Sequence, residues 1–137
     1  MAKNIYPIVW SACLDQNGSN RSTTDNHVGN QHDIMIAMTE GVHLNNTGHA
    51  AFKKGDYDTA IRNYLNAIEI KLRAYGEKSL HICITLSGLS DAYFKKGDIL
   101  NAKMECERML RIATTINNSE QVRIAKEILK DISDFLV

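Results

Sequence analysis

The five histidines and three cysteines are the residues of this chain best suited to bind a metal or to catalyse a reaction. Their spacing fits neither a metal site nor a catalytic group. No companion cysteine or carboxylate stands at zinc-ligand spacing from the histidines, which are His27, His32, His43, His49 and His81. Glycine-rich phosphate loops and the Gly-x-Ser-x-Gly pattern of serine hydrolases are also absent. The sequence therefore predicts a protein that is not an enzyme and uses no cofactor or metal.

The cysteines are odd in number and widely scattered, so they do not indicate a disulfide framework. Cys83 and Cys106 fall inside helical patterns, where a free thiol packs as a small apolar side chain, and Cys13 stands alone near the N-terminus. Unpaired thiols are typical of a reducing compartment, and we therefore expect a cytoplasmic protein.

A second group of side chains recurs at helical spacing and could recognise a peptide. Asn45, His49 and Phe52 lie four and three residues apart, so they share one face of a predicted helix. Asparagine and histidine can hydrogen-bond an extended backbone, and phenylalanine can take an apolar side chain. Phe52 could equally be a half-buried packing residue, and Lys53 could be a solvated helix end that faces the negative end of the dipole.

The elements that position these residues are repeated. Ala50–Tyr57 returns as Ala92–Ile99 with six of eight positions identical and an offset of 97 − 55 = 42 residues. Such a period indicates stacked units that bury their apolar faces against one another. The second copy provides four side chains at the positions of Asn45, His49, Phe52 and Lys53, which are Ser87, Asp91, Phe94 and Lys95.

Composition limits the classes of partner. The 137 residues suit a single domain, and 16 basic residues balance 16 acidic ones, so no global field attracts nucleic acid or anionic membrane. No apolar run approaches the length of about 20 residues that spans a bilayer. Ile5–Leu14 is apolar, but it is short for a secretory signal and Pro7 interrupts it. We expect that segment to be an arm that docks on the domain or stays loose.

The rest of the chain predicts an all-α domain. From Asp15 to Asp33 the composition is too polar to offset the entropy of ordering, so we expect a flexible arm at 1–32 and a helical domain at 33–137. Helix pairs are expected at 33–76 and 79–116, with a final helix at 118–136. Asn118 followed by Gln121 predicts a capping box for that last helix. The other predicted N-caps are Asp33, Asp56, Ser79 and Asp98, and the helix-ending glycines are Gly55, Gly76 and Gly97.

The spacing of small and large residues resembles the tetratricopeptide repeat, and the residues that carry the match in the first copy are Gly48, Gly55, Tyr57, Ala60, Tyr64 and Ala67. The second copy continues the pattern through Leu89, Tyr93, Gly97, Ala102 and Met109. Ser90 replaces a small glycine there, and Cys106 replaces an aromatic residue. The 42-residue spacing and the connector at 75–81 are similar to the repeats of kinesin light chain. The resemblance implies an α-solenoid of two helix pairs with a C-terminal capping helix.

The resemblance also implies a function, which is peptide or protein binding on the concave face lined by the first helix of each pair. An adaptor or scaffold with a protein or peptide partner is therefore expected. The implied contact residues are Asn45, His49, Phe52, Lys53, Ser87, Asp91, Phe94 and Lys95, with late positive charge from Arg123 and Lys126. Those two bases could equally be the polar face of an amphipathic helix.

Two alternatives differ from this interpretation. A clamp for a C-terminal carboxylate, found in some tetratricopeptide domains, is poorly matched because Asn45, His49 and Gly88 stand at its first three places. Self-association is the rival function, since two pairs fall below the three repeats that such arrays generally need. It would give a homodimer through the open ends of the solenoid or through the Ile5–Leu14 arm.

Overall fold

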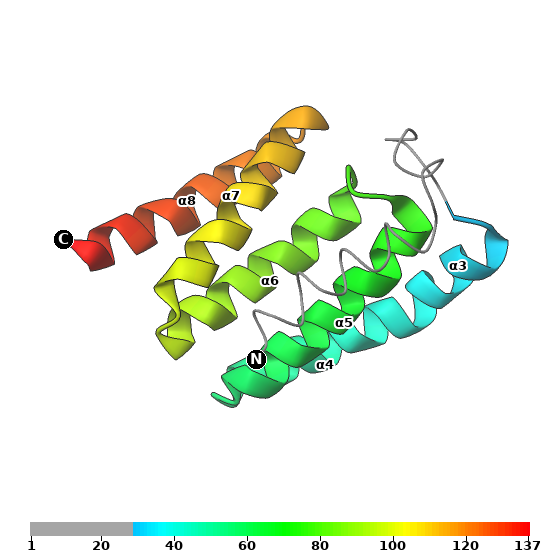
Figure 1. Cartoon of the computed structure of the whole chain (residues 1–137), viewed down its shortest axis with the longest axis horizontal. Coiled ribbons are helices and arrows are strands. Elements are labelled where there is room, and N and C mark those ends of the chain that lie inside the picture. The colour runs from blue at the N-terminus through cyan, green and yellow to red at the C-terminus, as the bar shows by residue number, and fades with distance from the viewer. Residues whose placement is uncertain (1–28) are drawn as a thin grey trace.

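The structure, a computed structural model, describes residues 29–137, and this part of the chain is entirely helical (Figure 1). The first helix is α3 (Gln31–Ile36), which runs without a break through a π-helical turn, η1 (Ala37–Gly41), into α4 (Val42–Lys53). The chain continues through α5 (Tyr57–Tyr75), α6 (Leu80–Lys96), α7 (Ile99–Thr115) and α8 (Ser119–Leu136). The predicted all-α architecture of two helix pairs and a final helix is confirmed.

The helices form two layers. Each second helix, α5 or α7, packs against the first helix of its own pair and against the first helix that follows it. The first helices α4, α6 and α8 also touch in sequence, whereas no comparable contact joins α5 to α7 in the described part. Because only the first helices touch within their layer, the stack curves with that layer inside. We call its solvent-facing side the inner face.

Local side-chain chemistry starts and ends most helices where the sequence predicted. Asp56, Ser79 and Asp98 each accept a hydrogen bond from the backbone N–H three residues later. Gly55 and Gly97 follow α4 and α6 with φ of 84° and 96°, a left-handed conformation that glycine adopts at no steric cost. These tight joints fold each pair back on itself.

Two predicted caps were wrong in detail. The first helix begins at Gln31 and not after Asp33, because Asn30 is its N-cap and Asp33 closes a capping box from inside the helix. The polar residues 29–32 therefore belong to the folded part. Asn118 does cap α8, but Gln121 Oε1 returns no bond and is buried without a partner in the described residues.

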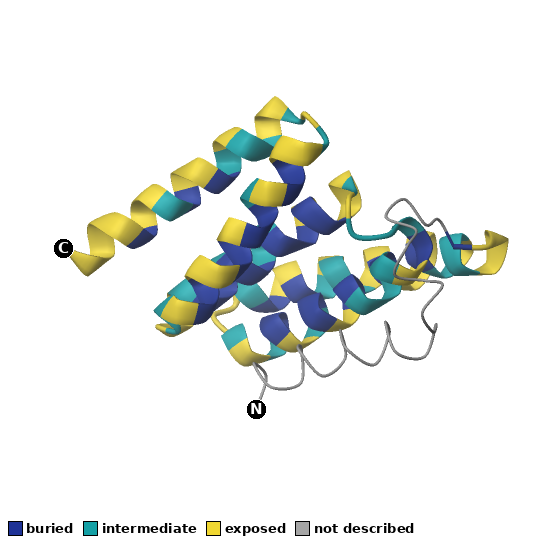
Figure 2. Ribbon diagram, turned by 45° about the horizontal axis from the view of Figure 1, so that its top comes forward, coloured by how far each residue is buried: buried dark blue, intermediate teal, exposed yellow. Residues whose placement is uncertain are grey.

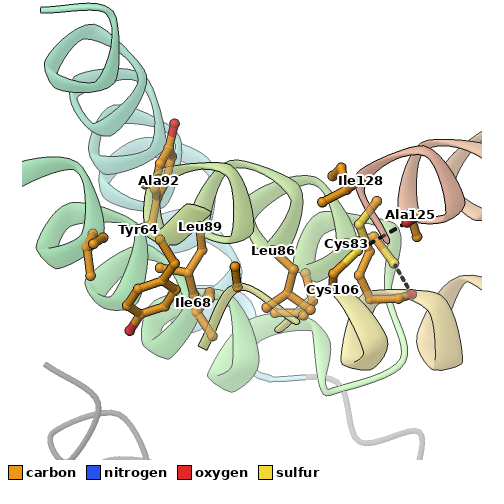
Figure 3. Close-up of a cluster of buried hydrophobic side chains, with 14 of the residues drawn as sticks. Tyr64, Ile68, Cys83, Leu86, Leu89, Ala92, Cys106, Ala125 and Ile128 are labelled. Atoms are coloured by element: carbon orange, nitrogen blue, oxygen red, sulfur yellow. Dashed lines mark hydrogen bonds between the residues drawn. The ribbon is translucent and has the colours of Figure 1, made fainter. Parts of the chain in front are cut away.

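The core runs between the two layers and contains both thiols of the described region (Figures 2 and 3). Cys83 Sγ lies 3.9 Å from the carbonyl of Met109, and Cys106 Sγ donates to the carbonyl of Ala125 at 3.1 Å. Burial raises the pKa of Cys83 to about 11 and that of Cys106 to about 12, so both remain protonated. Their predicted role as packing thiols is confirmed, while Cys13 and the Ile5–Leu14 arm lie outside the described residues.

The last helix completes the stack as a cap. α8 buries only Ala125, Ile128 and Ile132, and its opposite face is charged and exposed (Figure 2). Arg123 pairs there with Glu120 and Glu127. An amphipathic helix with one buried stripe closes an array without exposing its core, so the predicted capping role of α8 is confirmed.

We expect Ala102→Leu to destabilise the fold, because Ala102 is fully buried where α7 packs on α6 and its carbonyl accepts from Ser90 Oγ at 2.8 Å. Overpacking such a contact costs about 1–3 kcal/mol, which urea unfolding measures. Ala60→Leu, at the equivalent buried position of the first pair, should cost a similar amount. The control is Lys103→Leu at the adjacent exposed position, and neutral results at both alanines would contradict this helix pairing.

Candidate interaction surface on the inner face

One aromatic side chain sets the spacing of the first two inner helices. Tyr64 of α5 projects toward both, and it is drawn within the buried cluster of Figure 3. A Cβ at Gly48 of α4 would lie 3.0 Å from Tyr64 Cε1, and a Cβ at Gly88 of α6 would lie 2.7 Å from Tyr64 Cζ. Two glycines therefore let α4 and α6 close on the same ring.

A short polar chain then ties α4 to α6 beside that contact. Lys71 of α5 donates from Nζ to Thr85 Oγ1 at 2.7 Å, and Thr85 Oγ1 donates to Asn45 Oδ1 at 2.9 Å. A lysine ammonium carries only donors, so the Thr85 oxygen must accept from it and its proton turns to another acceptor. That proton has two acceptors within reach, Asn45 Oδ1 at 2.9 Å and the carbonyl of His81 at 3.4 Å. The shorter contact orients the Asn45 amide with its oxygen toward Thr85.

Fixing that amide leaves hydrogen-bond donors for a ligand. With Oδ1 of Asn45 held by Thr85, its Nδ2 points away, and no acceptor among residues 29–137 takes its protons. Asn45 is half-buried, so part of its surface remains open to solvent. The asparagine selected from the sequence therefore offers N–H donors to a carbonyl or carboxylate oxygen.

The other predicted residues of the inner face differ in how accessible their side chains are to a ligand. His49, Lys53 and Lys95 are exposed. Ser87 is half-buried and donates its hydroxyl hydrogen to the carbonyl of Ile84 at 2.7 Å, one turn earlier in α6. His49 is thus available to a ligand, whereas the Ser87 proton is already used within its own helix.

Both predicted aromatic anchors are half-buried and make ring contacts inside the chain. Phe52 packs on Tyr57 with ring centroids 5.6 Å apart, across the joint between α4 and α5. Phe94 meets the edge of Phe135 from α8 at 5.6 Å. A ligand that used Phe94 would have to share or displace Phe135.

The predicted acidic and basic residues do not gather into one anion site. Asp91 is half-buried, and burial raises the pKa of its carboxyl, with Lys95 opposing the shift and Asp131 of α8 adding to it. The α8 charge that acts on Asp91 is thus acidic. Arg123 is engaged by its own helix neighbours, and Lys126 lies exposed on the same helix. Arg123 and Lys126 are therefore not assembled with Asp91 into a carboxylate clamp.

Four apolar side chains of the inner face were missed by the sequence reasoning. Met38, Val42, Leu80 and Ile84 are 63%, 46%, 39% and 42% exposed. They form two pairs at the repeat offset, since 80 − 38 and 84 − 42 both equal 42. The signal was present in the sequence, because the same offset relates apolar residues one and two turns before Asn45 and Ser87. We call these four residues the apolar patch.

Neither a metal centre nor a membrane span is found in the part of the chain that the structure describes. No group of three histidine, cysteine or carboxylate side chains there could hold a metal ion. None of the described helices combines the length and apolar character that crossing a bilayer requires.

We expect Lys71 to make stability depend on alkaline pH. Lys71 is 5% exposed, and burial lowers its pKa from 10.5 to about 8. Between those values the unfolded chain binds more protons than the folded one, so the free energy of unfolding rises with pH over that window. Lys71→Met should remove this rise, and the wild-type-minus-variant difference should change by up to about 1.4 kcal/mol per pH unit. Parallel unfolding profiles from pH 7 to pH 10 would contradict the buried ammonium.

Comparisons with known proteins agree with this architecture. The sequence model of the tetratricopeptide repeat family matches residues 39–121, which is 121 − 39 + 1 = 83 of the 137 residues. Neither the curated proteins nor the solved structures contain a match to the chain. The match spans both helix pairs and the glycines that fit around Tyr64. The chain therefore belongs to the tetratricopeptide repeat family.

Proposed function

We propose that this protein is a non-catalytic adaptor or scaffold that holds a peptide or partner helix against its inner face. Tetratricopeptide repeat domains are generally protein-interaction modules, which supports the broad class. The partner in this proposal is a protein or peptide. It is neither nucleic acid nor a membrane, because the balanced charge of the chain creates no global field that would attract either one.

The observation that carries the proposal is the recurrence of exposed apolar residues on the inner face alone. Met38 and Val42 of the first repeat match Leu80 and Ile84 of the second, and all four are exposed. The second helices behave differently. Leu100 and Met104 are exposed on α7, but the equivalent residues of α5 are charged, Asp58 and Arg62. Exposed apolar side chains kept at equivalent positions in neighbouring helices favour an interaction surface over chance exposure.

Polar groups beside the apolar patch would orient a bound chain. The Asn45 amide presents N–H donors, and His49 lies exposed one turn further along the same helix. An extended peptide needs donors for its carbonyls and apolar contacts for alternate side chains, and a partner helix needs an apolar stripe. The inner face supplies both kinds of group, with Asn45, His49 and Asp91 as the polar contacts in this proposal.

Two finer assignments belong to the same proposal. We place the chain with the repeats of the kinesin-light-chain type, supported by the 42-residue offset and by the connector between α5 and α6. We also place it in the cytoplasm, supported by two buried thiols that stay unpaired in the described part.

Self-association is a second candidate, favoured by the exposed end of α8. Phe135 and Leu136 are 65% and 62% exposed there. If two copies meet through this end, Leu136→Asp should convert a dimer to a monomer in light scattering at constant concentration. A wild-type chain that is monomeric at all concentrations tested would exclude this candidate.

We expect the double variant His49→Glu, Asp91→Lys to lose partners that the wild-type chain retains from a lysate of its source. The variant changes the charge of the inner face, and neither the His49 nor the Asp91 side chain makes a hydrogen bond among residues 29–137. Its matched control is Lys103→Glu, Glu107→Lys, which makes comparable changes at exposed positions of α7. Both variants must melt at the wild-type temperature before capture is compared.

The comparison of the two variants decides where partners bind. A partner lost by the inner-face variant and kept by the control supports the proposal. A partner lost by the control and kept by the inner-face variant would move the interaction to the outer side of the stack. Quantitative mass spectrometry of the retained proteins measures both losses in one experiment.

A further inference from the structure

The apolar patch has no occupant in the described part of the chain. Its four side chains are between 39% and 63% exposed, far more than the core residues that flank them. Leaving large apolar side chains in water is unfavourable by about 25 cal/mol for each Å² that could be covered. A surface of this kind on two neighbouring helices is typical of a docking site.

The residues of the patch lie on η1, α4 and α6. The hydrogen bond of 2.9 Å from Thr85 Oγ1 to Asn45 Oδ1 brings the two helices together next to it. Val42 lies one turn before Asn45, and Ile84 directly precedes Thr85. Met38 and Leu80 each lie one further turn back, so the four side chains form one area at the N-terminal ends of the first helices.

The described chain begins at the same end of the molecule. The N–H of Gly29 donates to the carbonyl of Ala74 at 2.8 Å, in the last turn of α5. That turn leads directly into the connector before Leu80, the first residue of α6. Along the other helix, Met38 is seven residues from Gln31, a distance of about 10 Å at 1.5 Å per residue. Gly29, the first described residue, therefore lies at the same end of the inner helices as the patch.

The sequence before Gly29 contains a suitable occupant within reach. Its apolar segment is Ile5–Leu14, which includes Val9 and Trp10 and carries no charged side chain. Residues 15–28 separate it from Gly29, a length of 28 − 15 + 1 = 14 residues. A 14-residue connection averages about 20 Å end to end as a coil, which exceeds the distance to the patch without greatly overshooting it.

We propose that residues 5–14 of the same chain cover the apolar patch. A tether of this length gives the arm an effective concentration in the millimolar range, far above that of a second copy of the chain in solution. An uncharged apolar arm matches an apolar patch that contains no charged residue. The inference uses the inner face but requires no external partner, so it goes beyond the proposed function. A partner that binds the patch must displace the arm.

Trp10 reports the position of the arm directly, because it is the only tryptophan in the sequence. In the full-length wild-type chain we expect a blue-shifted emission and weak quenching by acrylamide, as for an indole packed on apolar side chains. The reference is N-acetyl-tryptophanamide in the same buffer. Emission is recorded across a hundredfold dilution, which separates docking within one chain from docking between chains.

Three variants of the full-length chain locate the contact. Ile84→Asp places a charge in the patch, and Val9→Asp places one in the arm without altering Trp10. Each should lower the ratio of docked to free arm at least about tenfold, which corresponds to about 1.4 kcal/mol. Met104→Asp is the matched control, since Met104 is 53% exposed on α7, outside the inner face. It should leave the quenching of Trp10 unchanged.

Several results would overturn the inference. Wild-type Trp10 that is quenched as readily as the free reference would show an undocked arm. Release by Met104→Asp, or no release by Ile84→Asp, would place the arm elsewhere. Protection lost on dilution would make the occupant a second copy. Circular dichroism melts exclude unfolding, and Val9→Asp keeps the test valid if a patch variant melts early. This experiment measures only the fluorescence of Trp10. A negative result would therefore overturn the docking of the arm without bearing on whether the inner face captures a partner.

Discussion

The inner face depends on one contact, the ring of Tyr64 held against two glycines. Gly48 and Gly88 come from successive first helices, and a Cβ at either would stand 3.0 Å or less from the ring. Protein interiors are packed too densely to absorb such an atom without moving an element. The distance between α4 and α6 is therefore set by Tyr64, a buried residue of the second-helix layer that does not reach the inner face.

With that spacing fixed, the inner face presents both oriented polar groups and exposed apolar side chains. Thr85 can reach Asn45, and the ammonium of Lys71 sets the direction of that hydrogen bond. The same two helices carry Val42 and Ile84, which are exposed apolar residues at equivalent positions of the repeat. Lys71 is buried, and no carboxylate of residues 29–137 offsets the cost of burying its charge, so the ammonium weakens the fold. This fits a hydrogen-bond network that orients side chains rather than one that adds stability.

Most of the helix ends followed from local rules, and one cap was misplaced. Asp56, Ser79 and Asp98 could be placed as caps because their bonds close within three residues. The first cap was misplaced because Asn30 and Asp33 are both good capping residues. The structure pairs them in one capping box with Asn30 as the N-cap.

The candidate site was harder to predict than the helices. Its polar residues could be proposed from their spacing, whereas the contact of Phe94 with Phe135 joins two helices and could not be predicted from spacing within one helix. The burial of Lys71 could not be predicted from the sequence either. Lysine normally stays in water unless a specific tertiary partner such as Thr85 holds it. The apolar patch could have been found by applying the 42-residue offset to every position.

The most direct test of the inner face as the working surface is site-specific photo-crosslinking in the full-length chain. A benzophenone amino acid replaces Ile84 on the inner face or Met104 on α7, both exposed and apolar. The account predicts adducts from position 84 and none from position 104, whether the trapped segment belongs to a partner or to residues 5–14. Adducts from position 104 alone would contradict it and assign binding to the outer helices.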